Sequence, residues 1–256
     1  MWRGFLKWPL PYLVIISLFL AACTATDDNR FLADSNTNSN NSNGNTDTTP
    51  ETITLKYLAL GDSYTIGTSV CDTCNYPIQL KDSLSELTDP IYNTSVEIIA
   101  TAGWTTTNLL NAISAAEPDN DHDLVTLLIG VNNQFQGKPF ELYETEFNTL
   151  VEQAIAFAGN DKDRVIVLSI PDYAYTPFGQ NFGNATMTSL EIDAYNSYAE
   201  NYCANNGISY VYITDISREG LDIPYLVASD GLHLSELAYS LFVQRLLPVV
   251  RQKIEE

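Results

Sequence analysis

The chain has 256 residues, of which 45% are hydrophobic and 17% charged, and this composition excludes a wholly disordered protein. The length is sufficient for one well-buried α/β domain with short appendages. A formal net charge of −20 argues against a nucleic-acid partner, because a strongly acidic protein repels phosphate polyanions.

Residues 1–22 have the organisation of an export signal. Arg3 and Lys7 precede an apolar stretch over residues 9–20, which is shorter than a membrane-spanning helix requires. The following Leu20-Ala21-Ala22-Cys23 resembles the lipobox of bacterial lipoproteins, which implies cleavage before Cys23 and acylation of that cysteine. An uncleaved anchor helix and an ordinary signal peptide with a chance cysteine are the alternatives. Because Thr24 is not aspartate, the outer membrane is the favoured destination if the cell is Gram-negative.

Residues 23–51 are predicted to be a lipid-anchored flexible tether. They are rich in Asn, Ser, Thr and Asp, and residues 35–49 have almost no apolar side chain to bury. A chain of this length spans about 30 Å when flexible. The folded domain is therefore predicted over residues 52–256, and the membrane is expected to be a partner only through the lipid at Cys23.

The folded domain alternates between two kinds of apolar segment, which predicts a three-layer α/β/α sandwich. Because the strand-like segments show no long polar and apolar alternation, we expect a central, mainly parallel, five-stranded sheet. These segments lie at about residues 54–60, 95–100, 124–130, 165–170 and 208–213. Between them, helical spacing covers residues 143–158, Thr188-x-x-Glu191 predicts a capping box for the next helix, and Ser235 precedes the last helix.

Three further cysteines lie within the predicted domain. Cys71 and Cys74 have a Cys-x-x-Cys spacing, which is compatible with a disulfide, half of a metal site or a redox pair. A zinc site needs more ligands, and His122 and His233 are the only histidines of the chain. We therefore interpret the pair as a disulfide or as two ordinary thiols, and Cys203 on an apolar helix face as a core residue.

A candidate nucleophile follows the first predicted strand. The apolar run over residues 57–60 ends abruptly in Gly61-Asp62-Ser63, and parallel sheets present their ligands beyond the carboxyl ends of their strands. A serine hydroxyl is a weak nucleophile by itself. It needs a base, an acid that orients the base, and donors for an oxyanion.

Residues after the second and third strands supply candidate donors. Gly103 leaves its backbone N–H open to a ligand, and Asn132 can donate through its carboxamide without carrying charge. Each of these residues is also common in ordinary turns.

The candidate base is His233. Asp230, three residues earlier, can accept its Nδ1 proton and leave Nε2 free to face a serine. A surface histidine beside a capping aspartate is the alternative. His122 lies between two aspartates at the start of the third strand, so we expect it at the far edge of the sheet and exposed to solvent.

Taken in order, Gly61-Asp62-Ser63, Gly103, Gly130-x-Asn132 and Asp230-x-x-His233 resemble the four blocks of the SGNH (GDSL-type) hydrolase family. The resemblance extends over about residues 55–254. It implies a flavodoxin-like fold, Ser63 as nucleophile, His233 as base and Asp230 as its orienting acid. It further implies an oxyanion hole formed by the N–H groups of Ser63 and Gly103 and by Asn132, with no metal or cofactor.

The family usually has aspartate after the asparagine of its third block, whereas this chain has Asn133. We expect Asn133→Asp to be tolerated, because it restores the usual residue. The resemblance predicts an esterase that forms an acyl-enzyme with a small-molecule or glycan ester, and aromatic side chains in residues 171–179 either line its pocket or pack beneath a loop. The alternatives are a catalytically silent ligand-binding surface lipoprotein and a binding protein that cradles phosphate at residues 61–68.

Overall fold

Five strands form a single parallel sheet in the computed structural model, which describes residues 51–88 and 90–255. The predictions made for residues 1–50 lie outside this part of the chain. The strand order is β2-β1-β3-β4-β5, and every neighbouring pair is parallel. The strands are β1 (Thr52–Gly61), β2 (Ile91–Ala100), β3 (Leu124–Leu128), β4 (Val165–Leu168) and β5 (Ser209–Val211). The predicted sheet is thereby confirmed.

The carboxyl ends of three adjacent strands finish level with one another. Gly61, the last residue of β1, pairs with Ala100 at the end of β2 and with Leu128 at the end of β3. The segments that follow these strands therefore leave the sheet side by side. This register places three of the four predicted sequence blocks at one edge.

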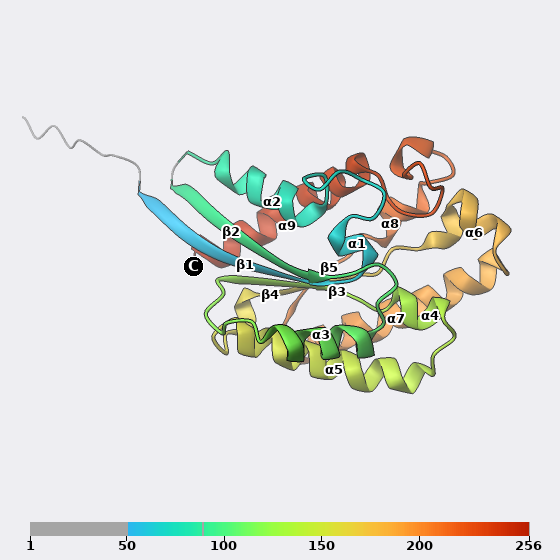
Figure 1. Ribbon diagram of the computed structural model, residues 1–256, viewed down its shortest axis with the longest axis horizontal. Helices are drawn as coiled ribbons and strands as arrows, with labels where there is room; N and C mark the ends of the chain where they lie inside the picture. Colours follow the sequence, from blue (N-terminus) through green and yellow to red (C-terminus); the bar gives the residue numbers. More distant parts are fainter. Residues whose placement is uncertain (1–50, 89, 256) are drawn as a thin grey trace, which may run out of the picture. The chain divides into compact units, whose positions relative to one another are not determined.

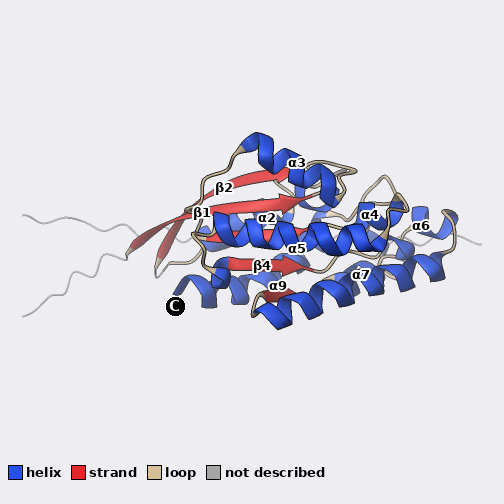
Figure 2. Ribbon diagram, turned by 90° about the horizontal axis from the view of Figure 1, so that it is seen from below, coloured by secondary structure: helices blue, strands red, loops and turns tan. Residues whose placement is uncertain are grey.

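Helices cover both faces of the sheet and make the outer layers of the sandwich (Figure 1). One face carries α1 (Ser63–Ile66), α2 (Tyr76–Ser85), α8 (Thr214–Arg218) and α9 (Glu236–Glu255). The other carries α3 (Thr106–Ala116), α4 (Val131–Phe135), α5 (Phe140–Phe157) and α7 (Ala185–Asn206). Helices α4 and α6 (Pro177–Asn181) lie at the end toward which the strands point (Figure 2). Short 3₁₀ turns are η1 (Lys162–Arg164), η2 (Tyr173–Tyr175) and η3 (Pro224–Leu226).

The core lies on both faces of the central strands. All residues of β3 and β4 are buried, which is why their sequences are continuously apolar apart from Thr126. The Thr126 hydroxyl shares hydrogen bonds with the hydroxyls of Tyr57 (2.8 Å) and Tyr76 (3.2 Å). The one polar side chain of these two strands is thus satisfied inside the core.

Two of the predicted helix positions are confirmed, and one predicted boundary is wrong. Helix α5 covers the predicted 143–158 segment to within a few residues, and the Ser235 hydroxyl accepts from the Ala238 N–H at the start of α9. The expected capping box at Thr188 does not start a helix. Helix α7 begins earlier because the Asn184 side chain accepts from the Met187 N–H, which already provides the N-cap.

The three cysteines of the described domain are in the states that their sequence context predicted. Cys71 and Cys74 form a disulfide, and Cys203 is a free thiol buried in the core. Across residues 51–88 and 90–255, none of the helices has both the length and the apolar character needed to cross a membrane. The same residues gather no group of three or more His, Cys, Asp or Glu side chains suited to a metal ion.

Candidate active site

Ser63 is the first residue of α1, directly after β1, and is almost completely buried. The preceding Gly61 permits this sharp transition, because a Cβ at that position would lie 2.1 Å from Thr65 Oγ1 and 2.5 Å from the Leu128 carbonyl. Asp62 caps the helix by accepting from the Tyr64 N–H at 3.0 Å. The N–H groups of Thr65 and Ile66 bond to the Asp62 carbonyl. Because these N–H groups already bond to Asp62, they are not free to bind a phosphate, which argues against a phosphate-cradling loop at residues 61–68.

Asp230 and His233 form the close pair that their spacing predicts. The His233 Nδ1 lies 2.6 Å from Asp230 Oδ2, and Asp230 Oδ1 accepts from the N–H groups of Leu232 and His233 at 2.9 and 3.0 Å. With Nδ1 held by the carboxylate, Nε2 is the nitrogen available to a reacting group.

The surroundings of Asp230 favour its charged, deprotonated form. Partial burial would raise the pKa of this carboxyl, but hydrogen bonds from Ser69, His233 and two backbone N–H groups outweigh it and hold the pKa well below its usual range. Asp230 therefore remains a carboxylate that accepts the Nδ1 proton of His233.

Ser63, Asn132 and His233 line one pocket of about 60 Å³ at the carboxyl edge of the sheet. The remaining walls are largely apolar and come from α1, α4, η2 and the loop before α9; they are Tyr64, Val131, Phe135, Tyr173 and Leu232. The Tyr64 ring lies 5.7 Å from the His233 imidazole, centroid to centroid. Residues from widely separated parts of the chain thus meet around one small, largely apolar pocket.

The two candidate oxyanion donors have different positions. Asn132 lines the pocket, and its Nδ2 donates to the Trp104 carbonyl at 3.0 Å and lies 3.5 Å from Asp62 Oδ2. The second contact is long, so the corresponding hydrogen can be redirected toward a substrate oxygen. Gly103 does not line the pocket. It is the neighbour of Trp104, and a Cβ at Gly103 would meet no atom within 4 Å, so its backbone is open to a ligand.

Asp62 is a buried carboxyl beside the nucleophile. Its side chain is fully buried, and burial raises its pKa to about 7, although hydrogen bonds from Tyr64 and Asn132 act in the opposite direction. Asp62 therefore changes charge near neutral pH. Asp62 Oδ2 also faces the Asn132 amide, so this carboxyl helps to orient the Asn132 side chain.

Asn133 has a structural task that the sequence did not reveal. Its buried side chain accepts from the Thr106 N–H at 2.9 Å and donates to Thr106 Oγ1 at 2.6 Å. The Thr106 hydroxyl in turn donates to Glu146 at 2.5 Å. An aspartate at position 133 would remove the Nδ2 donor and add a second carboxylate around the same hydroxyl. This geometry reverses the expectation that Asn133→Asp is tolerated.

His122 lies at the amino-terminal end of β3, opposite the candidate site, as expected. Its predicted exposure is wrong, because only 4% of the residue is accessible to solvent. The ring packs beneath the surface with Nδ1 3.3 Å from the Phe157 carbonyl, while Nε2 lies 3.8 Å from Glu97. The two flanking aspartates suggested a polar surface strand, and this tertiary contact could not be read from them.

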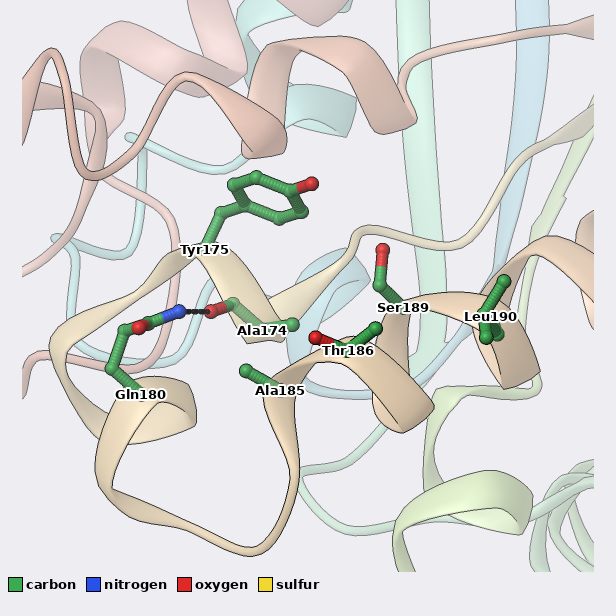
Figure 3. Close-up of a pocket in the computed structure, with 7 residues that line it drawn as sticks. All are labelled: Ala174, Tyr175, Gln180, Ala185, Thr186, Ser189 and Leu190. Carbon is green, nitrogen blue, oxygen red and sulfur yellow. Dashed lines mark hydrogen bonds between the residues drawn. The ribbon is translucent and has the colours of Figure 1, made fainter.

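A larger hollow of about 240 Å³ lies between η2, α6 and the start of α7 (Figure 3). Three of its lining residues carry a hydroxyl group, namely Tyr175, Thr186 and Ser189. The Ser189 hydroxyl donates to the buried Asp172 at 2.6 Å and accepts from Arg218 at 3.2 Å. No histidine lines this hollow, so it has no base for a serine. The smaller pocket at Ser63 is the candidate active site.

Sequence reasoning missed two contributors to this site. Phe135, three residues after Asn132 on α4, was not singled out although it lines the pocket. Ser69 was also missed, and its hydroxyl donates to Asp230 Oδ2 at 2.6 Å. Helical spacing from Asn132 could have indicated Phe135. Nothing in the local sequence links Ser69 to a residue 161 positions away.

Comparison with known proteins agrees with this arrangement. The family model described as GDSL-like lipase/acylhydrolase matches residues 59–241, which is most of the chain and includes Ser63 and His233. This chain belongs to the GDSL-like lipase/acylhydrolase family. Membership in the GDSL family makes the protein a serine hydrolase of carboxylic esters. A search of curated protein sequences gave no significant match.

Solved structures share the fold of this GDSL-family hydrolase. A lipolytic G-D-S-L family protein from Veillonella parvula has 17% identity and a TM-score of 0.58, covering 77% of this chain and 98% of its own. A lipase/acylhydrolase from Enterococcus faecalis has 20% identity and a TM-score of 0.57, covering 78% and 95%. An acetylxylan esterase from Geobacillus stearothermophilus has 18% identity and a TM-score of 0.55, covering 77% and 94%. At such identities the likeness establishes the fold alone.

Proposed function

We propose that this protein hydrolyses carboxylic esters through an acyl-enzyme on Ser63. The observation that carries the proposal is the single pocket lined by Ser63, Asn132 and His233, with His233 Nδ1 held 2.6 Å from Asp230. A nucleophile, a base and a neutral donor surround one space at the carboxyl edge of the sheet. The hollow shown in Figure 3 has no comparable set.

The reaction uses each of these groups in turn. His233 Nε2 takes the hydroxyl proton as Ser63 Oγ attacks the ester carbonyl, and Asp230 stabilises the imidazolium that forms. Asn132 and the N–H groups of Ser63 and Gly103 stabilise the oxyanion. Collapse of the tetrahedral intermediate breaks the ester C–O bond, and His233 returns the proton to the leaving alcohol. Water then attacks the acyl-enzyme with the same base and releases the acid.

The surroundings of the pocket favour esters with a small or apolar acyl group. The pocket, at about 60 Å³, is small. Beyond it, the Phe135 ring stacks on Phe182 at 5.0 Å and lies 6.2 Å from Phe178. Phe135 and Phe182 are both exposed, at 38% and 45%. A longer acyl chain leaving the pocket would find apolar contacts there.

The test is a series of p-nitrophenyl esters from acetate to decanoate. We expect turnover by the wild-type protein that Ser63→Ala abolishes while the circular dichroism spectrum and Tm stay unchanged. If Phe182 supports longer chains, Phe182→Ala should raise KM for the octanoate and leave the acetate unaffected. Turnover that survives in Ser63→Ala would disprove the mechanism, and absence of turnover on the whole series would favour the silent binding protein.

We further propose that the enzyme is a lipoprotein of the bacterial cell envelope, attached through Cys23. The support is the sequence Leu20-Ala21-Ala22-Cys23 behind a basic and apolar leader, together with the disulfide of the folded domain, which is typical of exported proteins. Labelled palmitate should be incorporated by the wild type in a bacterial host and not by Cys23→Ser. An unlabelled wild type would disprove the anchor.

A further inference from the structure

We propose that Ser69 is a positioning residue for Asp230, and that the loop over residues 67–75, which contains the Cys71–Cys74 disulfide, serves to present it. This inference rests on the proposed function, because it concerns the aspartate of the same site. The Ser69 hydroxyl donates to Asp230 Oδ2 at 2.6 Å, and this is the oxygen that faces His233 Nδ1.

Asp230 needs such a partner because it is not enclosed. Its side chain is 31% exposed, so burial alone does not fix its orientation. The backbone N–H groups of Leu232 and His233 hold Oδ1. At Oδ2, Ser69 is the partner that comes from outside the Asp230–His233 turn. Its O–H holds the plane of the carboxylate toward the imidazole and withdraws part of its negative charge.

The backbone of the loop is unusual at Ser69. Its φ of 69° lies in the left-handed region, which non-glycine residues rarely adopt and which tends to persist where the surrounding structure enforces it. No described helix or strand requires this conformation, since α1 ends at Ile66 and is capped by Gly67. The geometry directs the hydroxyl across to the loop before α9, where Asp230 lies.

Several contacts enforce the loop. Cys71 and Cys74 are joined by the disulfide, and the Cys74 N–H also bonds to the Cys71 carbonyl. The buried Asn75 donates through Nδ2 to the Ile66 carbonyl at 3.3 Å and to the Asp72 carbonyl at 3.0 Å, which ties the two ends of the loop together. In this proposal the role of the Cys-x-x-Cys disulfide is structural, because it holds the loop that carries Ser69.

The first test compares Ser69→Ala and Ser69→Gly, with Ser85→Ala as control because Ser85 is an exposed helix serine that bonds to the carbonyl one turn earlier. Both Ser69 variants lose the hydroxyl, but glycine tolerates positive φ, so Ser69→Gly should fold at least as stably as alanine. We expect kcat on p-nitrophenyl acetate to fall about tenfold in both, a part of the usual contribution of general-base catalysis, with KM within about twofold. Wild-type kcat in Ser69→Gly would overturn the proposal.

A second readout does not depend on turnover. The chain has two histidines, so the ring protons of His233 can be followed by NMR, with a His122 variant for assignment. The titratable groups facing His233 are Asp230 and Tyr64, whose ring lies 5.7 Å away. Without the Ser69 hydroxyl, Asp230 Oδ2 loses the bond that fixes it toward His233 Nδ1, so the His233 ring resonances should shift in Ser69→Ala relative to wild type at the same pH. Unchanged His233 resonances would overturn the role of Ser69, even if no ester were cleaved.

The role of the disulfide is tested by a double-mutant cycle. Cys71→Ser with Cys74→Ser should also lower kcat, and adding Ser69→Ala should cost less than in the disulfide-bonded protein, because the loop acts through that hydroxyl. Fully additive effects would overturn the link between the disulfide and Ser69. Wild-type turnover no higher than that of Ser63→Ala would refute the proposed function, and the NMR comparison of the His233 resonances would still decide on Ser69.

Discussion

Asp62→Asn should change how the stability of this enzyme depends on pH. Asp62 is fully buried, and its pKa is raised from the usual 3.8 to about 7 by burial. Between these two values the folded protein holds a proton that the unfolded chain releases. Because the folded state binds more protons in this window, wild-type stability falls as pH rises through it and levels off above pH 7. Asparagine has no proton to lose there.

The size of the effect follows from the pKa. From pH 5 to pH 7 the folded state keeps its proton over two pH units, and at about 1.36 kcal/mol per unit the wild type loses about 2.7 kcal/mol. Guanidinium unfolding of both proteins at pH 5 and pH 8 would measure it. The advantage of Asp62→Asn over wild type should be larger at pH 8 by about that amount. A difference between the two proteins that is the same at both pH values would refute the raised pKa of Asp62.

Four further variants test the site. Asn132→Ala should lower kcat by about 10²–10³-fold with little change in KM, because it removes a donor to charge that develops in the transition state; a change confined to KM would indicate ground-state binding instead. His233→Ala should be nearly inactive by the same assay, whereas His122→Ala should keep its kcat per folded molecule and show a lower Tm, since its ring is buried far from Ser63; the opposite pattern would identify His122 as the base. Asn133→Asp should destabilise the protein by about 1–3 kcal/mol in urea unfolding, because it places a buried carboxylate opposite Glu146, and wild-type stability would show that the pocket accommodates the extra charge.

The strands were predictable because burial on both faces leaves a continuous apolar run, as in β3 and β4. The start of α7 was not predictable, because Thr188 and Asn184 are both suitable N-cap residues and only the folded structure shows which of them caps the helix. The exposure of His122 was wrongly predicted for a related reason. Flanking aspartates indicate a polar segment, but whether a ring packs against the Phe157 carbonyl depends on how α5 ends.

The positions of the candidate nucleophile and its partners were predictable because each follows a strand or precedes a helix at a recognisable turn. The structure has Ser63 and the Asp230–His233 pair at the edge of the sheet where that reasoning put them. The contacts that bind these segments together were not predictable. Ser69 reaches Asp230 across 161 positions, and Asn133 bonds to Thr106 on another helix. Such pairs depend on the level ends of the strands and on loop geometry, and neither leaves a periodic signal in the sequence.

The late position of the Asp230–His233 pair in the chain bears on when a complete site can first form during synthesis. Ser63 and Asn132 follow strands in the first half of the chain, but Asp230 and His233 belong to the loop just before α9, which packs against α2. A nascent or truncated chain that ends before Asp230 therefore carries Ser63 without the proposed base, and one that ends before α9 has no last helix to hold the loop of that base in place. On the proposed mechanism, we expect ester cleavage only after the carboxyl-terminal segment has docked.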